Sequence, residues 1–247
     1  MKALITTPVP IDRQKLVIKD NALIMASYSL SVEEQRLILA CIEKAHSQKK
    51  PLSMGETVEM SLTVHEYANQ YKVSMSAAYK ALGKSSDRLY DRSIFIKENG
   101  VKRKIRWLQE RAIYSSGKVR LVFSNVVSKH IREVVTTQTA YLLAQATQLR
   151  TQHSIRLFEI FQTKIDPISQ EGTWEVSVEE FKILLDIKEK YTLWRDLKRK
   201  VIVHAVELIN KNTSLKVEWS PSEKDNKKII RIKFEIFEAT QLNLSLK

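Results

Sequence analysis

Cysteine occurs once in the 247 residues, as Cys41, and glycine and proline occur five times each. A single cysteine excludes an intrachain disulfide and a cysteine-based zinc finger. Because Cys41 lies in the apolar run of residues 37–42, we expect a small buried hydrophobe rather than a reactive thiol. With 43% hydrophobic residues, the scarcity of glycine and proline predicts packed domains and not extensive disorder.

The chain also lacks the motifs of common enzymes. It has no Gly-x-x-x-x-Gly-Lys-Ser/Thr phosphate loop and no Gly-x-Gly-x-x-Gly dinucleotide fingerprint. Its histidines are scattered, without the paired spacing of a metal site: His46, His65, His130, His153 and His204. We therefore expect a binding protein that is not an enzyme, with no catalytic residues, no metal and no cofactor.

No stretch approaches the ~18 apolar residues of a membrane span, and the N-terminus lacks the apolar core of a secretory signal. The sequence thus predicts a cytoplasmic protein without a membrane partner. What it has in excess is positive charge, a net +13, which favours a polyanion such as nucleic acid. Residues 1–135 hold 23 Lys and Arg against 13 Asp and Glu, net +10, whereas residues 136–247 hold 18 against 15, net +3.

One pattern occurs twice, about 114 positions apart, at residues 63–67 and 177–181. Each copy begins with a hydroxyl residue three positions before a glutamate, a capping box that satisfies free N–H groups at a helix start. Each continues as a short amphipathic helix, a basic helix and two strand-like runs joined by a polar loop. Helix, turn, helix and β-hairpin form a winged helix, so the sequence predicts an α+β fold of two winged helices in tandem.

In the first copy, a helix of about residues 64–71 turns at residues 72–73 into a second helix near residues 76–92. At ~100° per residue, one side of this second helix is expected to face the core through Tyr79, Leu82, Ser86 and Leu89. The opposite side carries Ser76, Ala77, Lys80, Lys84 and Arg88. A basic stripe can be an ordinary solvated face, but its place on the second helix of the unit favours DNA contact.

The first copy continues with a strand at residues 94–96 and with Asn99-Gly100, whose tolerance of positive φ predicts a type I′ hairpin turn. The returning strand carries three basic residues, which we expect on the wing: Lys102, Arg103 and Lys104. Such residues suit phosphate contacts, although edge strands also use charge to avoid pairing with other strands. A second turn at residues 115–117 leads to a strand at residues 119–123.

In the second copy, a helix of about residues 178–186 precedes a long helix of about residues 192–211. One apolar face of the long helix is expected to pack inward: Trp194, Leu197, Val201, Ala205 and Leu208. His204 falls on the same inward half, where packing or hydrogen bonding is expected. Polar and basic residues lie opposite or on the flanks: Thr192, Arg195, Lys198, Arg199 and Lys200. Recognition helices read base edges from their N-terminal end, where arginine can bond two guanine acceptors.

A polar joint at residues 136–139 predicts the domain boundary. The first winged-helix domain then covers residues 1–135, including a loosely ordered N-terminal arm with Pro8 and Pro10, and the second covers residues 136–247. Because the first domain is the more basic half, we expect it to supply mostly DNA backbone affinity, while the second reads more of the base sequence.

Several segments closely resemble those of bacterial plasmid replication initiators, the iteron-binding Rep family. In the first domain they are NALI at 21–24, ASYSLS at 26–31 and EQRLIL at 34–39. In the second they are IRLFE at 155–159, LKRKV at 197–201 and AVELIN at 205–210. The resemblance runs from about residue 15 to residue 237.

The resemblance implies two winged helices that bind direct repeats, or iterons, at a plasmid origin in the bacterial cytoplasm. It implies monomers that open the origin and help recruit host replication proteins such as the helicase. It also implies dimers, in equilibrium with these monomers and joined chiefly through the first domain, which bind an inverted repeat and repress their own gene. Two alternatives remain: a winged-helix transcription regulator without a replication role, and a protein–protein assembly module that binds no DNA.

Overall fold

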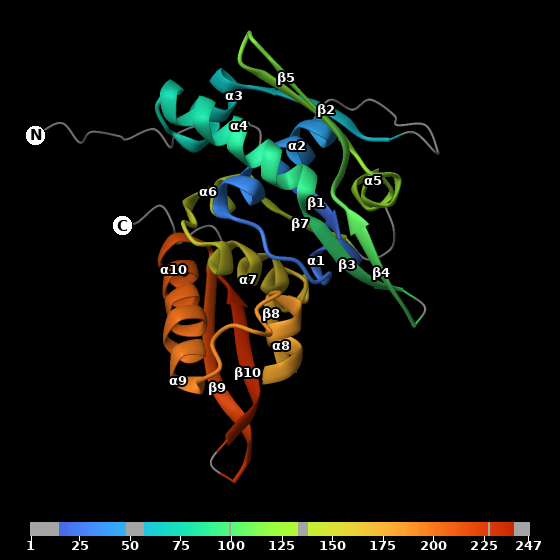
Figure 1. The fold of residues 1–247 in the computed structure, drawn as a ribbon. Coiled ribbons are helices and arrows are strands. Elements are labelled where there is room, and N and C mark those ends of the chain that lie inside the picture. The colour runs from blue at the N-terminus through green and yellow to red at the C-terminus, as the bar shows by residue number, and fades with distance from the viewer. Residues whose placement is uncertain (1–14, 48–56, 99, 133–137, 227, 240–247) are drawn as a thin grey trace, which may run out of the picture.

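The computed structural model describes residues 15–47, 57–98, 100–132, 138–226 and 228–239. Most of the expected N-terminal arm, with Pro8 and Pro10, lies outside these residues, as does Asn99 of the expected hairpin turn. Figure 1 shows two lobes, one above the other, with the helix α7 (Gln152–Gln162) between them.

Each lobe contains one three-stranded antiparallel sheet. The first sheet has the order β2-β6-β5 and consists of β2 (Glu59–Thr63), β5 (Leu108–Tyr114) and β6 (Lys118–Phe123). The second has the order β8-β10-β9 and consists of β8 (Glu171–Ser177), β9 (Leu215–Asp225) and β10 (Lys228–Glu238). In both sheets the last strand lies in the middle, paired with the strand that precedes the helices.

The helices repeat in the same way. The first lobe has α2 (Val32–Ser47), α3 (Val64–Tyr71) and α4 (Met75–Asp91). The second has α7, α8 (Val178–Leu184) and a continuous helix made of α9 (Trp194–Leu197), the π-helical segment η1 (Lys198–Val203) and α10 (His204–Asn212), hereafter the α9–α10 helix. The order helix, strand, helix, helix, strand, strand therefore occurs twice, which confirms the prediction of two winged helices in an α+β chain.

The first lobe contains one hairpin more than the second. The strands β3 (Ser93–Glu98) and β4 (Val101–Arg106) form a separate two-stranded sheet between α4 and β5. The expectation that residues 102–104 lie on the wing is corrected here, because the hairpin that joins the sheet of β2 is β5–β6. Gly100 and Gly117 adopt positive φ, 78° and 75°, at the turns of the two hairpins.

A further pair of strands joins segments that are distant in sequence. The strand β1 (Leu16–Asp20) pairs antiparallel with β7 (Gln138–Leu142). This pairing crosses the expected boundary between residues 135 and 136, so the position of the domain boundary stays a prediction. The remaining helices are α1 (Asn21–Ile24), α5 (Asn125–Arg132) and α6 (Leu143–Gln148).

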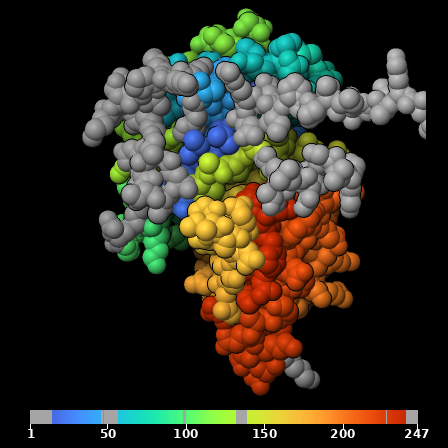
Figure 2. Space-filling model, turned by 180° about the vertical axis from the view of Figure 1, so that it is seen from behind, coloured from blue at the N-terminus to red at the C-terminus, as the bar shows by residue number. Residues whose placement is uncertain are grey.

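Aromatic side chains occupy the centre of each lobe. In the first, the buried Trp107 packs edge-on against Tyr28, with ring centroids 5.1 Å apart. In the second, Phe234 of β10 stacks with Trp174 at 5.4 Å and with Phe181 at 6.0 Å. Such rings bury large apolar areas, which holds each sheet to its helices. Seen from behind, the β9–β10 hairpin projects to the lower end of the molecule, away from the first lobe (Figure 2).

Candidate nucleic-acid interface

The helix that precedes the basic helix is capped in the same way in both lobes. In α3, the Thr63 hydroxyl accepts from the Glu66 N–H at 3.1 Å, and Glu66 accepts from the Thr63 N–H at 2.8 Å. In α8 the Ser177 hydroxyl accepts from the Glu180 N–H at 3.1 Å, and Glu180 accepts from the Ser177 N–H at 3.3 Å. These bonds satisfy the free N–H groups of each first turn, so the two predicted capping boxes are confirmed. They fix the first turns of α3 and α8, the helices that precede the two basic helices α4 and α9–α10.

The helix α4 of the first lobe, which follows α3, separates apolar and basic sides as expected. It follows Lys72, whose φ of 51° makes the turn from α3, and its N-cap is Ser74. The inward side consists of Ala78, Leu82, Ser85, Ser86 and Leu89, all buried. The predicted contact residues are all exposed: Ser76, Lys80, Lys84 and Arg88.

Tyr79 corrects the expected core of α4, because its side chain is 57% exposed. It lies at the margin of the buried side, where its ring faces the turn between β5 and β6. A Cβ placed on Gly117 would lie 4.0 Å from Tyr79 Cδ2 and 3.1 Å from Val64 Cγ2. The turn at Gly117 thus packs closely against Val64 and leaves only ordinary van der Waals contact with the exposed ring of Tyr79.

The β3–β4 hairpin exposes the basic residues Lys102, Arg103 and Lys104. In its register Phe95 pairs with Lys104 and Lys97 with Lys102. The ammonium groups of Lys102 and Lys104 lie 5.1 Å and 5.8 Å from the centroid of the Phe95 ring. The ring orients both lysines by cation–π attraction while leaving their charge on the surface.

In the second lobe, every predicted contact residue is exposed: Thr192, Arg195, Lys198, Arg199 and Lys200. Thr192 precedes the helix, whose N-cap is Leu193, whereas the other four lie on its first turns. Lys198 lies 5.7 Å from the ring centroid of Trp219 on β9. The basic end of the helix is thereby linked to the strand that leads into the wing.

The π-helical segment η1 changes which residues of this helix point inward. Val201, Ala205 and Ile209 are buried, whereas the expected core residue Leu208 is only half-buried and His204 is exposed. A π-turn bonds residue i to i+5 and accommodates one additional residue. The inward side after η1 is consequently shifted by one position, which corrects the expectations for Leu208 and His204.

Ion pairing differs between the two basic helices. Among the described residues, Lys80, Lys84 and Arg88 of α4 have no carboxylate within ion-pair distance. On the α9–α10 helix, Asp196 Oδ1 lies 3.9 Å from Arg199 Nη2 and 3.4 Å from Lys200 Nζ. The cations of α4 are thus available to an external anion, whereas two cations of the second helix share an internal carboxylate.

Three neighbours of the predicted residues were not singled out from the sequence: Phe95, Asp196 and Trp219. Asp196 stands three and four positions before Arg199 and Lys200, the spacing of helical ion pairs, so this partner could have been found from spacing alone. Phe95 and Trp219 reach their lysines across strands or from another element, and no local pattern indicates such contacts.

Other site types find no support in the described residues. Within them, no group of three or more His, Cys, Asp and Glu side chains could hold a metal ion. No helix of the same residues has both the length and the apolar character that crossing a membrane requires. Cys41 is buried, and burial raises the pKa of its thiol to about 12, which disfavours the reactive thiolate.

Comparisons with known proteins agree with this geometry. A replication initiation protein of Escherichia coli is 26% identical over 206 residues, which are 82% of this chain but only 64% of that protein's length. The crystal structure of the Pi initiator protein in complex with iteron DNA has a TM-score of 0.76 at 21% identity, covering 92% of this chain and 98% of the other. At that identity the likeness shows the fold alone.

Two family models match almost the whole of the described chain. The model for Initiator Replication protein, WH1, matches residues 16–162, and the model for Initiator Rep protein, WH2, matches residues 177–236. The first of these already covers more than half of the sequence. The chain belongs to the family of replication initiator proteins built from two winged-helix domains.

Proposed function

We propose that the protein binds double-stranded DNA sequence-specifically at repeated sites of a plasmid origin and thereby initiates DNA replication. The observation that carries the proposal is the exposed basic side on the last helix of each winged helix, α4 and the α9–α10 helix. Membership of the initiator family supports it, as does the iteron DNA bound to the similarly folded Pi initiator.

In this proposal the α9–α10 helix lies in the major groove with its N-terminal end toward the bases. Arg195 and Arg199 read base edges, because a guanidinium can donate two parallel bonds to the O6 and N7 acceptors of guanine. Thr192, Lys198 and Lys200 contact the flanking phosphates. The wing β9–β10, which begins beside Lys198 at Trp219, follows the same DNA segment.

The first domain holds a neighbouring DNA segment, mainly through its backbone. Ser76 at the start of α4 and the stripe of Lys80, Lys84 and Arg88 meet phosphates. The β3–β4 hairpin adds Lys102, Arg103 and Lys104. Phosphate contacts of this kind position a protein on DNA but carry little sequence information, which fits the larger positive charge of the first half.

The wider role follows from the family resemblance. The protein acts in the bacterial cytoplasm without catalysing a reaction itself. As a monomer it opens the origin and recruits host replication proteins such as the helicase. As a homodimer in equilibrium with the monomer, it binds an inverted repeat and represses its own gene. The two domains act as separate DNA-binding units, with the boundary proposed between residues 135 and 136.

The rival proposal is a transcription regulator with the same two winged helices and no role in replication. Footprinting of the protein on its parent replicon tests DNA binding first, since an initiator should protect several short direct repeats with regular spacing. A transformation assay then separates the two roles. A plasmid bearing these repeats should replicate only in cells that supply the protein, and replication without it would refute the initiator proposal.

A further inference from the structure

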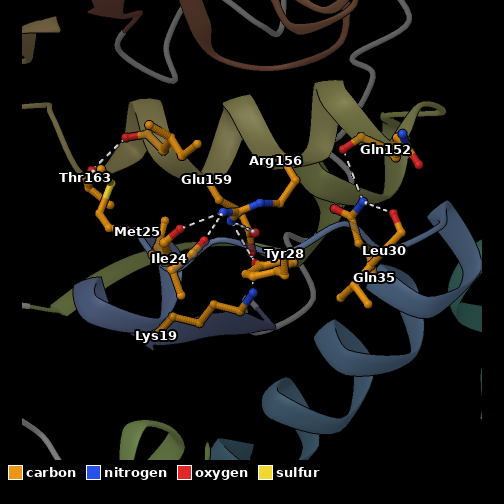
Figure 3. Close-up of polar contacts among 12 residues, drawn as sticks. Lys19, Ile24, Met25, Tyr28, Leu30, Gln35, Gln152, Arg156, Glu159 and Thr163 are labelled. Atoms are coloured by element: carbon orange, nitrogen blue, oxygen red, sulfur yellow. Dashed lines mark hydrogen bonds and ion pairs between the residues drawn. The ribbon is translucent and has the colours of Figure 1, made fainter. Parts of the chain in front are cut away.

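The helix α7 lies between the lobes and packs against both (Figure 1). On one side, Phe161 contacts Trp174 and Phe234 of the second lobe, with ring centroids 6.1 Å and 5.1 Å apart. The other side carries a stripe at spacings of four, three and four residues: Gln152, Arg156, Glu159 and Thr163. This spacing follows the helical period, and all four side chains or backbones meet the first lobe (Figure 3). We call this contact the α7 seam.

Arg156 is the centre of the α7 seam. Its buried guanidinium donates from Nη1 to the Tyr28 hydroxyl at 2.7 Å, and from Nη2 to the carbonyl oxygens of Ile24 and Ala26, both at 2.9 Å. The same group lies 3.8 Å from the centroid of the Tyr28 ring. Because the guanidinium is planar and bonds three acceptors on residues 24–28, it fixes the angle between α7 and this segment as well as the distance between them.

Glu159, one turn further, is held by both strands of the β1–β7 pair. Its Oε1 atom accepts from Lys19 Nζ on β1 and from the Tyr141 hydroxyl on β7, both at 2.5 Å, and the three residues are buried. Burial opposes ionisation, but the charges of Lys19 and Arg156 hold the pKa of Glu159 below its usual range. The carboxylate lies between the Lys19 ammonium and the Arg156 guanidinium, which favour its ionised form, although burial also lowers the pKa of Lys19.

The ends of the α7 seam are joined as well. Gln35 of α2 donates from Nε2 to the carbonyl oxygens of Gln152 at 3.1 Å and of Leu30 at 2.9 Å. At the other end, the Thr163 hydroxyl lies 3.9 Å from Met25 Sδ. Contacts thus extend over the full length of α7.

The same segment of the first lobe also holds the basic β3–β4 hairpin. The backbone of Ser27 exchanges two hydrogen bonds with Phe95 of β3, both at 2.9 Å. The Ser27 hydroxyl donates to the carbonyl oxygen of Ile183 on α8 at 2.5 Å. Residues 24–28 are therefore bonded to α7, to α8 and to the hairpin, and so connect the hairpin, which the proposed function places on DNA, to two helices of the second lobe.

Buried ion pairs contribute little net stability compared with well-packed apolar groups, because the cost of desolvation offsets their attraction. Their geometry is nevertheless demanding, since a buried donor that loses its acceptor is costly. A rotation of one lobe against the other would separate several of these pairs together. The α7 seam thus favours a single relative orientation far more than it favours folding.

We propose that Lys19, Arg156 and Glu159 are positioning residues that set the angle between the two DNA-binding units, and so the permitted spacing between the two DNA segments they bind. The inference rests on the proposed function for its DNA part. It also accounts for a feature of the sequence: residues 21–31 and 155–159, singled out separately by their resemblance, meet each other in this seam.

The test is to bind the full chain to duplexes in which its footprinted site is lengthened by one or two base pairs between the segments protected by the two domains. Each added pair rotates one segment by roughly a tenth of a helical turn. The wild-type protein should lose about tenfold or more in affinity per inserted pair, a mismatch cost of ordinary size. The variant Lys19→Met/Arg156→Met/Glu159→Met should lose less than about threefold, while binding each segment alone as the wild type does.

The control is Lys233→Met/Glu235→Gln, which removes a partly exposed ion pair of 2.7 Å on β10 outside the seam and should keep the wild-type spacing preference. An unchanged preference in the triple seam variant would overturn the inference. Should that variant fail to fold, the loss of affinity per inserted base pair is measured for Arg156→Lys instead. Lysine keeps the charge but cannot form the three hydrogen bonds of the guanidinium, so this loss should again be smaller than in the wild type.

A second measurement separates this inference from the proposed function, because it needs no DNA. Spin labels on cysteines introduced at the exposed Gln109 and Glu218 report the distance between the lobes, since the native Cys41 is buried. A narrow distance distribution in the wild type that broadens in the seam variant supports the inference. Equal widths overturn it, and a wild type that binds no repeat DNA overturns the proposed function instead.

Discussion

The Asp196 carboxylate lies 3.4 Å from Nζ of Lys200, four residues later on the helix proposed to read DNA. Asp196 is also 3.9 Å from Arg199 Nη2, and its side chain is 24% exposed. Random DNA offers only phosphates to these two cations, and Asp196 both competes for them and repels phosphate. Under the proposed function the correct site offers base edges in addition, so we expect the carboxylate to weaken non-specific binding more than specific binding.

Replacing Asp196 by Asn should therefore raise affinity for random duplex DNA by about threefold to tenfold, because one repulsive charge at the groove is worth roughly 1 kcal/mol. Affinity for the repeat should rise less, so that the specificity ratio falls. Fluorescence anisotropy with random and repeat duplexes at one salt concentration measures both. Glu207→Gln, an exposed carboxylate later on the same helix, is the control. Equal affinity of Asp196→Asn and wild type for random DNA would contradict the role given to Asp196.

Substitution of Arg199 by Ala tests the assignment of the reading helix. Loss of a bidentate base contact should cost about 1–3 kcal/mol and relax the preference at one base position. Binding to a set of singly substituted repeats shows whether the change is confined to one position. Lys211→Ala, exposed on the last turn of the same helix, removes a charge far from the proposed contact and is the matched control. Unchanged affinity and selectivity in Arg199→Ala would mean that another element reads the bases.

Substitution of Arg103 by Ala on the β3–β4 hairpin should weaken binding to all sequences to a similar extent. A phosphate contact carries no base information, and its loss should reduce the slope of log affinity against log salt concentration by about 1. Titrations at several salt concentrations measure the slope, with the uncharged exposed Gln109→Ala as the control. A change of base preference at any one position would instead assign Arg103 to the reading contacts.

We expect His153 to make the stability of the protein depend on pH. Burial, together with the charge of Lys190, lowers the pKa of His153 to about 4, whereas the unfolded chain has an ordinary histidine pKa near ~6.5. The unfolded state therefore binds the extra proton first. The contribution of the neutral His153 to the free energy of unfolding is therefore complete above pH ~6.5. As the pH falls toward ~4, the free energy of unfolding decreases by up to about 3 kcal/mol. Urea unfolding across this range should show a shallower pH dependence for His153→Leu than for the wild type. The control is His65→Leu, at an exposed position.

Replacing two of the glycines by alanine should change the free energy of unfolding in opposite directions. A Cβ on Gly172 would lie 2.3 Å from the backbone oxygen of Lys164, so Gly172→Ala must displace the connection between α7 and β8. We expect a loss of roughly 1–3 kcal/mol or more in the free energy of unfolding. Gly83, within α4, has no neighbour within 4 Å of such an atom, and Gly83→Ala should stabilise by ~0.5–1 kcal/mol. Denaturant unfolding of both variants measures these signs, and a stable Gly172→Ala would show that the connection can yield.

The features that could be predicted from the sequence are those encoded by neighbouring residues. The capping boxes at Thr63 and Ser177 involve residues three positions apart, and the exposed side of α4 follows from the helical period. Together these local patterns were enough for two winged helices in tandem. The DNA contacts themselves stay predictions, although the structure does place all twelve proposed side chains on the surface.

The features that could not be predicted from the sequence depend on pairing between segments that are distant in the chain. Two hairpins follow α4, and only the pairing of β2 with β6 decides which is the wing. Lys19 and Glu159 are 140 positions apart, so no spacing rule could connect them. The pairing of β1 with β7 is of the same kind, since the strands that meet there begin more than a hundred residues apart.

The π-turn η1 has a practical consequence for mutagenesis of the α9–α10 helix. Drawn on a helical wheel from Trp194 onward, His204 and Leu208 occupy the sector of Leu197 and Val201. In the folded chain that sector belongs instead to Ala205 and Ile209, which are enclosed, while His204 meets water. A library designed from the wheel would therefore treat the exposed His204 as a core position and omit the enclosed Ile209.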